Sequence, residues 1–307
     1  MMPPPGKTMR LTPPAEGASP SFGRNLEGMR PRPSAAIAVL ALCLVIPATG
    51  ADAPPPDNPS GVTGSPYLHA DLRELTEAIT FHVSFDAESM VPDLAAGDAY
   101  RPQLHASWDK KHTAPVFADG LVGKALVLGT GLAYYPSAGN APLDTRGAVA
   151  LWVKPENWRR PNGATVGFFQ AAGGGGAQLI LQRQGPGRTE AGVVSRHEQV
   201  QCLARGSSAQ QRFTNIPTQA WDNGGWHLMV VNWSWPRMEV SIDAGPFRAR
   251  SAPSAPKAGA FRNLVVGSGG GFSDRTLLDE LLIFRRPLSR QEAQLLHRIL
   301  AKQAAVP

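Results

Sequence analysis

Short runs of alternating apolar and polar residues, separated by turns, constrain the fold of this chain most strongly. Alternation at period two is the pattern of a β-strand with one buried face. The 307 residues include 29 prolines and 32 glycines, which favours many turns over long helices. Runs of this kind occupy residues 79–85, 131–137, 147–155, 164–170, 177–183 and 191–196. Their regular spacing predicts an all-β sandwich.

The run GAVALWVKP, residues 147–155, is apolar on both of its faces, so we expect a central strand. Trp152 belongs to the same face as Ala148 and Ala150. Aromatic side chains in such strands fill the space between two sheets, and we predict this place for Trp152. Residues 101–116, by contrast, have no apolar pattern and are predicted to form a long loop.

The N-terminal part of the chain is predicted to lie outside the folded domain. Residues 1–28 are rich in Pro and Gly without apolar periodicity, so we expect them to be disordered or not translated, with Met29 as the true start. Residues 54–66 form a proline-led linker. One domain, residues 67–307, follows the linker.

Residues 29–53 have the three parts of a secretory signal peptide. Arg30 and Arg32 precede an apolar run over residues 35–46, and Ala51-Asp52-Ala53 offers an A-x-A cleavage site. The apolar run is shorter than the roughly 20 residues that span a bilayer. We therefore expect no stable membrane span after cleavage, while an uncleaved anchor stays an alternative. The predicted location is secreted, periplasmic or at the cell surface.

Two later segments carry clear turn or start signals. Residues 226–245 have the pattern of a hairpin that turns at residues 234–237. Ser289 and Glu292 have the S-x-x-E spacing of a capping box, which predicts the start of a helix. The apolar stripe of this helix consists of Ala293, Leu296, Ile299 and Leu300. We expect the helix to pack against the sandwich through this stripe.

Four segments together resemble one known family. In residues 264–300 a short apolar run, a Gly-rich turn, the pair Asp279-Glu280 and the capped helix follow one another. This order is similar to the end of LamG-like (laminin-G-like) jelly roll domains of the concanavalin A-like lectin/glucanase superfamily. Residues 119–126, 147–155 and 226–245 are similar to internal hairpins and strands of its bacterial secreted or surface members. The resemblance implies an antiparallel jelly-roll sandwich of two sheets with a short C-terminal helix.

The same resemblance implies a secreted or surface module that binds carbohydrate or mediates adhesion, with a glycan or a surface protein as partner. A glycoside hydrolase is the catalytic alternative, because that superfamily also contains such enzymes. Retaining hydrolases place two carboxylates about 5 to 5.5 Å apart. Glu239 and Asp243 do not match the required E-x-D-x-x-E pattern, and Asp279 and Glu280, as strand neighbours, should point to opposite faces. We therefore predict a non-catalytic module, with a protein–protein interaction module as a further alternative.

Other ligand classes find little support in the sequence. Residues 120–125 contain a Gly-Lys pair but lack the spacing and the hydroxyl of a phosphate-binding loop. The seven histidines show no zinc spacing, and Cys202, the one cysteine left after signal cleavage, cannot form an internal disulfide. The net charge of +6 comes with scattered arginines, predicted to lie on a solvated face, so no nucleic-acid partner is expected. These arginines are Arg183, Arg188, Arg196, Arg205 and Arg212.

Calcium is the one metal that the resemblance implies, because some laminin-G-like jelly rolls bind one Ca²⁺ at a loop rim. Carboxylates and backbone carbonyls are the ligands that this ion prefers. Asp119, Asp144, Asp222 and Asp274 are the loop acids that could supply them, although no motif selects among the four. The metal ligands therefore stay unassigned.

Three tryptophans are the candidates for carbohydrate binding. Trp158, Trp221 and Trp235 fall in predicted loops or turns, beside Arg, Asn and Asp residues. Sugars present both C–H faces and hydroxyl groups, so an aromatic ring next to polar side chains suits them. The alternative for each tryptophan is that it closes the edge of the core.

Overall fold

A computed structural model of the chain describes residues 73–107, 111–158, 165–173, 177–184, 199–205, 212–217, 221, 224–252, 254–268 and 275–303. All of them belong to one compact unit, Gly50–Pro307. The segments predicted as N-terminal extension, signal peptide and linker lie outside the described residues, and so does the predicted strand at residues 191–196.

The described strands form two sheets, and every pairing between neighbouring strands is antiparallel. The nine-stranded sheet runs in the order β14 (Arg248–Ser251), β13 (Arg237–Ile242), β12 (His227–Ser234), β7 (Arg146–Pro155), β16 (Thr276–Phe284), β1 (Ile79–Val83) and β2 (Leu94–Ala95), with β4 (Val116–Asp119) and β5 (Lys124–Val127) joined to β16. The seven-stranded sheet runs in the order β11 (Arg212–Pro217), β10 (Gln199–Arg205), β9 (Gln178–Gln184), β8 (Val166–Gly173), β15 (Phe261–Ser268), β6 (Gly131–Pro136) and β3 (Gln103–Ala106). The predicted all-β fold of two antiparallel sheets is confirmed.

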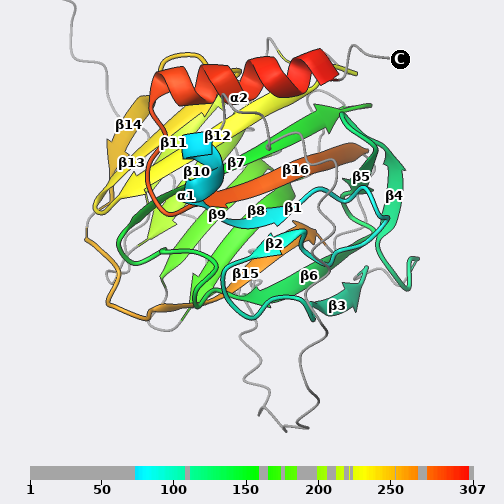
Figure 1. Cartoon of the computed structure of the whole chain (residues 1–307), viewed down its shortest axis with the longest axis horizontal. Coiled ribbons are helices and arrows are strands. Elements are labelled where there is room, and N and C mark those ends of the chain that lie inside the picture. The colour runs from blue at the N-terminus through cyan, green and yellow to red at the C-terminus, as the bar shows by residue number, and fades with distance from the viewer. Residues whose placement is uncertain are drawn as a thin grey trace, which may run out of the picture. The chain divides into compact units, whose positions relative to one another are not determined.

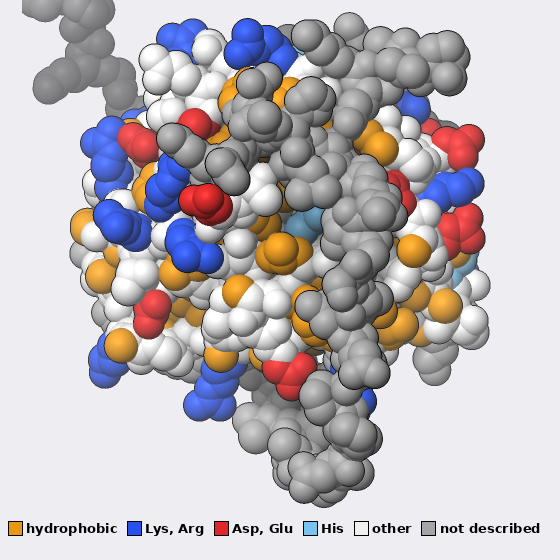
Figure 2. All heavy atoms as spheres, viewed as in Figure 1, with side chains coloured by type: hydrophobic (Ala, Val, Ile, Leu, Met, Phe, Trp, Pro, Cys, Tyr) orange, Lys and Arg blue, Asp and Glu red, His pale blue; other side chains and the backbone are white. Residues whose placement is uncertain are grey.

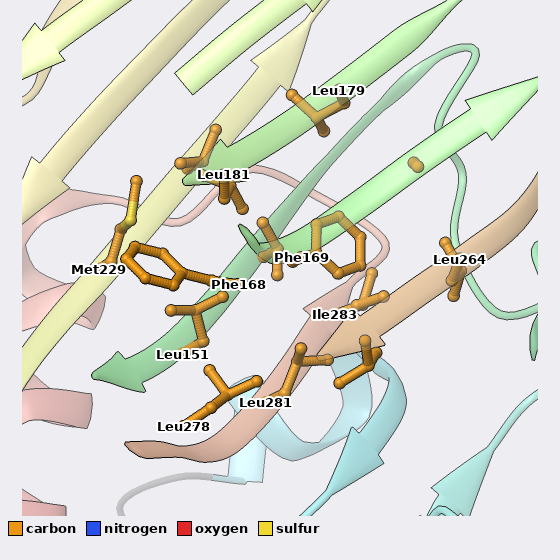
Figure 3. Packing of buried hydrophobic residues seen from close by; sticks show 14 of the residues in the cluster. Leu151, Phe168, Phe169, Leu179, Leu181, Met229, Leu264, Leu278, Leu281 and Ile283 are labelled. Atoms are coloured by element: carbon orange, nitrogen blue, oxygen red, sulfur yellow. The ribbon is translucent and has the colours of Figure 1, made fainter. Parts of the chain in front are cut away.

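The main core lies between the two sheets, where each strand presents every second side chain. Figure 3 shows Leu151 of β7 and Ile283 of β16 in one cluster with Phe169, Leu179 and Leu264 of the other sheet. These side chains are almost completely buried. Burying a large apolar side chain contributes about 1.5 to 3 kcal/mol relative to leaving it exposed. Contacts of this kind hold the sandwich together without a disulfide, and Cys202 lies in the same core as a free thiol.

The outer face of the nine-stranded sheet is covered by helices (Figure 1). The helix α2 (Arg290–Gln303) packs through Ala293, Leu296 and Leu300, and the short helix α1 (Arg73–Ala78) joins the same cluster. The predicted capping box is present: the Ser289 N–H donates to Glu292 Oε2 at 2.7 Å, and the Glu292 N–H donates to Ser289 Oγ at 3.2 Å. The predicted C-terminal helix and its buried stripe are thus confirmed.

The predicted place of Trp152 is wrong. Trp152 lies on the outer face of β7, in the cluster below α2, and its ring stacks on His297 at a centroid distance of 5.2 Å. Alternation correctly groups Trp152 with Ala148 and Ala150. It does not tell which of two apolar faces meets a helix and which meets the other sheet, because both environments are apolar.

The predicted loop of residues 101–116 is also partly wrong, because it contains the strand β3. All four residues of β3 are exposed, and the strand pairs only with β6. An edge strand with no buried side chains needs no apolar alternation, so its sequence lacks the signal used for the other strands.

The described part of the chain contains no helix that is long and apolar enough to cross a membrane. On the face that Figure 2 shows, basic and acidic side chains are interspersed and not gathered into one basic stripe.

Candidate functional site: the amide face of the seven-stranded sheet

The outer face of the seven-stranded sheet differs from that of its partner sheet, because both described helices pack on the nine-stranded sheet. Leu179 and Leu181 of β9 point into the core. Successive side chains of a strand point to opposite faces, so Gln178, Ile180 and Gln182 point outward. We use the name amide face for twelve outward-facing residues near the middle of five strands, which are Tyr134, Gly167, Gln170, Ala172, Gln178, Ile180, Gln182, Gln201, Leu203, Arg205, Asn263 and Val265.

The strand register arranges the amide face in three rows that cross the strands. The middle row is mainly apolar and contains Leu203, Ile180, Gln170, Val265 and Tyr134 on successive strands from β10 to β6. One flanking row contains Gln201, Gln182 and Gly167. The other flanking row contains Arg205, Gln178, Ala172 and Asn263. Side-chain amides therefore border an apolar row on both sides.

Two apolar members of the middle row are almost completely buried. Leu203 and Val265 are 7% and 8% exposed, yet neither belongs to the core between the sheets or to the cluster below the helices. The amide of Gln182 is half-buried, and its Nε2 donates to Gln201 Oε1 at 3.3 Å. At the other end of the row, the ring of Tyr134 meets His105 of β3 edge to face, at a centroid distance of 4.9 Å.

The chemistry of the amide face suits a polar, uncharged ligand. A glutamine side chain offers two donor hydrogens and an acceptor oxygen, so it can pair with either role of a hydroxyl group. Ile180 and Tyr134, the partly exposed members of the middle row, offer contact to C–H surfaces. A few polar groups on an apolar surface are the usual composition of a small-molecule or sugar site.

The sequence interpretation missed the amide face, although a signal was present. In AQLILQR, residues 177–183, glutamines stand at the polar positions of the alternation, and QVQCLAR, residues 199–205, repeats that pattern. The interpretation used alternation to find the buried side of each strand. The polar side carries the same information about the opposite face, and the signal is glutamine at the outward positions 178, 182, 199 and 201.

The structure brings two of the three candidate tryptophans together. The rings of Trp158 and Trp221 stack at a centroid distance of 5.6 Å, and Trp221 stacks in turn on His227 at 4.3 Å. Trp158 Nε1 donates to Thr276 Oγ1 at 2.7 Å. The two tryptophans are 6% and 7% exposed and belong to the core between the sheets. In this arrangement they close one end of the core and offer little ring surface to a ligand.

Arg183 joins the same cluster, which corrects its assignment to a solvated face. Its side chain is fully buried, and its guanidinium lies over the ring of Trp158 at 4.4 Å. The alternation of β9 directs Arg183 inward and its neighbour Gln182 outward. The planar guanidinium can be buried there because it stacks on an indole face. This cluster therefore packs against the inner side of β9, whose outer side carries Gln182.

Trp235, the third candidate, lies at the other end of β12, in the turn to β13. Trp221 stacks on His227, the first residue of β12, so the length of an eight-residue strand, roughly 25 Å, separates the two sites. Trp235 is half-buried, its Nε1 donates to the Leu143 carbonyl at 2.6 Å, and its ring packs on Phe261. The three tryptophans do not form one binding surface.

The acidic pair of β16 is buried in a polar cluster. The strand has a bulge between Asp279 and Leu282, and Glu280 adopts a left-handed φ of 47°. The expectation of opposite faces is therefore wrong for this pair, because an extra residue between the inward-facing Leu278 and Leu281 breaks the alternation. Both carboxylates meet partners on the helix-covered side of the sheet.

Each of these carboxylates has a defined structural partner. Asp279 Oδ2 accepts the N–H groups of Leu121 and Val122, and Oδ1 accepts the N–H of Glu280. Glu280 Oε2 lies 2.7 Å from Nε2 of His82. Burial, followed by the charge of Glu280, raises the pKa of Asp279 well above its usual value. The cluster fixes the hairpin of β4 and β5 and the first strand to β16, which is a structural role.

Two of the four loop acids named as possible calcium ligands belong to the described residues, and each has a partner within the protein. Asp119 is almost fully exposed and pairs with Lys124 Nζ at 3.1 Å, and Asp144 Oδ2 accepts the N–H of Gly259. Asp222 and Asp274 lie outside the described residues. Within the residues that the structure describes, no group of three or more His, Cys, Asp or Glu side chains could hold a metal ion.

Comparison with solved structures finds the same overall fold in domains of other proteins. Domain 4 of AbnA, a GH43 extracellular arabinanase from Geobacillus stearothermophilus in complex with arabinotriose, is 22% identical, with a TM-score of 0.50, over 72% of this chain and 98% of that domain. The receptor-binding domain of botulinum neurotoxin mosaic serotype C/D has a TM-score of 0.55 at 8% identity.

The ligand-binding domain of botulinum neurotoxin serotype D, in complex with N-acetylneuraminic acid, has a TM-score of 0.52 at 7% identity. This chain spans about half the length of the neurotoxin domains, 51% in both cases. At such identities the likeness shows a shared fold. No protein-family model matches the chain, and no curated protein matches it in sequence.

Proposed function

We propose that this protein is an exported, non-catalytic glycan-binding module of the LamG-like type, and that the amide face is its binding surface. The observation that carries the proposal is the hydrogen-bonded pair of Gln182 and Gln201 beside an apolar row, on the sheet face that neither described helix covers. Structural neighbours that bind sugars on the same fold support it. The buried acids of β16, Asp279 and Glu280, have no part in the proposed binding.

The amide face is a better candidate than the three tryptophans for a physical reason. A sugar stacks on an indole only if one ring face is accessible. Trp158 and Trp221 use their ring faces for each other, for Arg183 and for His227. The half-buried amides of Gln170, Gln178 and Gln182 keep part of their surface accessible to solvent.

The test is binding of the whole chain to a panel of soluble and insoluble polysaccharides, each with calcium and with chelator. We expect saturable binding that is lost in the double variant Gln182→Ala/Gln201→Ala. Gln291→Ala is the matched control, because Gln291 is an exposed glutamine on α2, over the opposite sheet. Unchanged binding in the double variant would move the site elsewhere, with Trp158→Ala and Trp235→Ala as the next variants. Absence of binding to any glycan would leave a protein-interaction module.

Chelator sensitivity addresses the calcium expectation separately. Loss of binding in chelator, with recovery on adding Ca²⁺, would support a metal site built with acids outside the described residues. Equal binding in both buffers would argue against a metal in recognition.

A further inference from the structure

We infer that a second copy of this chain docks on the edge strand β3, so that the β3 strands of two copies pair antiparallel about a two-fold axis. The inference concerns association of the chain with itself and does not depend on the proposed glycan binding. It rests on the exposure of β3, on its lack of charge and on the fit of its sequence to itself.

The strand β3 is an open edge of the seven-stranded sheet (Figure 1). It pairs with β6 on one side and with no described strand on the other. All four of its residues are exposed. The backbone N–H and C=O groups along such an edge can pair with a further strand.

Leu104 of β3 is the most exposed large apolar side chain among the described residues, at 54%. Its neighbour across the ladder is Ala133 of β6, which is buried in the core between the sheets. Residues directly opposite each other in neighbouring strands share a face, so Leu104 points to the inner side of the sheet, beyond the border of the core. A further strand beside β3 would extend this inner face and cover Leu104.

The charge of β3 distinguishes it from the edge strands β4 and β14. The strand β14 carries Arg248 and Arg250, and β4 ends at Asp119. Charged side chains on an edge strand oppose pairing with another strand. The sequence of β3, QLHA, contains no proline and no formal charge at neutral pH. Pairing of β3 with a second β3 therefore brings no like charges together.

The sequence of β3 complements itself in one antiparallel register. A two-fold axis perpendicular to the sheet keeps the inner faces of both copies on the same side. With the axis at Leu104, this residue lies opposite Leu104 of the second copy as an apolar cross-strand pair. Gln103, on the outer side with Tyr134, then lies opposite His105 of the second copy. A side-chain amide and an imidazole ring can share a hydrogen bond.

The size of this contact sets the expected strength of association. Stable protein–protein complexes bury about 1,200 to 2,000 Å² of surface. Two paired strands of four residues bury less than this. We therefore expect a dimer that dissociates in the micromolar range and is monomeric in dilute solution.

The experiment measures the average mass of the whole chain by sedimentation equilibrium between about 1 and about 500 µM, where a weak dimer is detected. We expect a monomer–dimer equilibrium. Leu104→Asp and Leu104→Lys should each weaken association at least about 10-fold, because like charges then face each other at the axis. An equimolar mixture of the two variants should restore association, because opposite charges then face each other. Ala258→Asp is the matched control, since it adds a charge at an exposed position outside β3.

Three results would overturn the inference. The first is a chain that stays monomeric over this concentration range, which would leave β3 open to a strand of a different protein. The second is association that Leu104→Asp leaves unchanged or that Ala258→Asp weakens equally, because the contact would then lie elsewhere. The third is association that the mixture of Leu104→Asp and Leu104→Lys does not restore, because Leu104 would then not face itself.

A cross-linking experiment replaces the charge variants if either of them does not fold. Residues directly opposite each other in antiparallel strands have Cα atoms about 4.5 to 5.5 Å apart, within the range that a disulfide spans. Leu104→Cys should therefore form a disulfide-linked dimer under mild oxidation, whereas Gln103→Cys should not. Equal cross-linking of the two variants, or none in Leu104→Cys, would contradict the register.

Discussion

Asp279 shows how much one buried carboxylate contributes when all of its partners are donors. Its two oxygens accept three backbone N–H groups, at 2.6 Å from Leu121, 3.3 Å from Val122 and 2.8 Å from Glu280. In Asp279→Asn one acceptor oxygen becomes an NH₂ group that faces donors. We expect a loss of about 1 to 3 kcal/mol in the free energy of unfolding, measured by urea denaturation.

The matched control for that substitution is Glu239→Gln. Glu239 forms a partly exposed ion pair with Arg237 on β13, and such pairs contribute about 0 to 1 kcal/mol. Equal losses in the free energy of unfolding of the two variants would show that the backbone hydrogen bonds of Asp279 contribute no more than the partly exposed ion pair of Glu239.

His82 makes stability depend on pH. Burial alone would lower its pKa, but the hydrogen bond and charge of Glu280, with Asp93 and Asp86, raise the pKa above its ordinary value. The folded chain then holds this proton more tightly than the unfolded chain. The stabilisation is complete below the unfolded pKa of about 6.5 and is lost as pH rises through the folded pKa. The raised pKa of Asp279 also makes the folded state less stable as pH rises. This effect begins at a lower pH than that of His82, because the ordinary pKa of an aspartate is lower than that of a histidine.

We therefore expect the free energy of unfolding to decrease as pH rises above about 6.5, measured by urea denaturation at several pH values. His82→Gln should reduce this slope, because glutamine does not titrate. A slope that is unchanged in the variant would assign the pH dependence to other groups.

Residue roles were harder to predict from the sequence than residue burial. Alternation along residues 131–137 puts Tyr134 and Tyr135 on opposite faces, and in the structure Tyr135 is buried while Tyr134 is partly exposed. The partners of Arg183 did not follow, because its contact with Trp158 joins residues that the sequence separates by a whole strand. Side chains that meet across the fold leave no local pattern.

At the scale of elements, the capping box of α2 gives a direct test. Ser289 Oγ accepts the Glu292 N–H, which has no partner within the first turn of a helix. Ser289→Ala should cost about 1 kcal/mol of stability, measured by chemical denaturation. Ser251→Ala on the exposed edge strand β14 is the control, with an expected change within about 0.5 kcal/mol. A larger loss in the control would show that serine exchange alone explains the result.

The central strand β7 and the capped helix could be predicted, whereas the edge strands β3 and β14 and the interior strand β10 (Gln199–Arg205) were not predicted. The strand β7 has ten residues with apolar side chains on both faces, and its sequence alone indicates a central position. The strands β3 and β14 have mostly exposed residues, so their sequences lack the apolar period. The strand β9 was predicted, but the outward side of its alternation, with Gln178 and Gln182, gave no prediction.

At the scale of the described domain, the two sheets have different partners. The nine-stranded sheet is buried on both faces, by the core on one side and by the helices on the other. The seven-stranded sheet shares only its inner face with the core. Buried residues thus cover both faces of the nine-stranded sheet, whereas neither described helix packs on the outer face of the seven-stranded sheet.

The buried thiol of Cys202 can be used to detect separation of the two sheets. This thiol lies between the sheets, and burial raises its pKa to about 12. Only a thiolate reacts quickly with an alkylating reagent, so the folded protein should protect Cys202. Peptide mass spectrometry after timed maleimide exposure should show slow labelling of Cys202, accelerated by urea in step with unfolding; fast labelling in native buffer would contradict this. Because no disulfide engages the thiol, each labelled molecule records one separation of the two sheets, without any added probe.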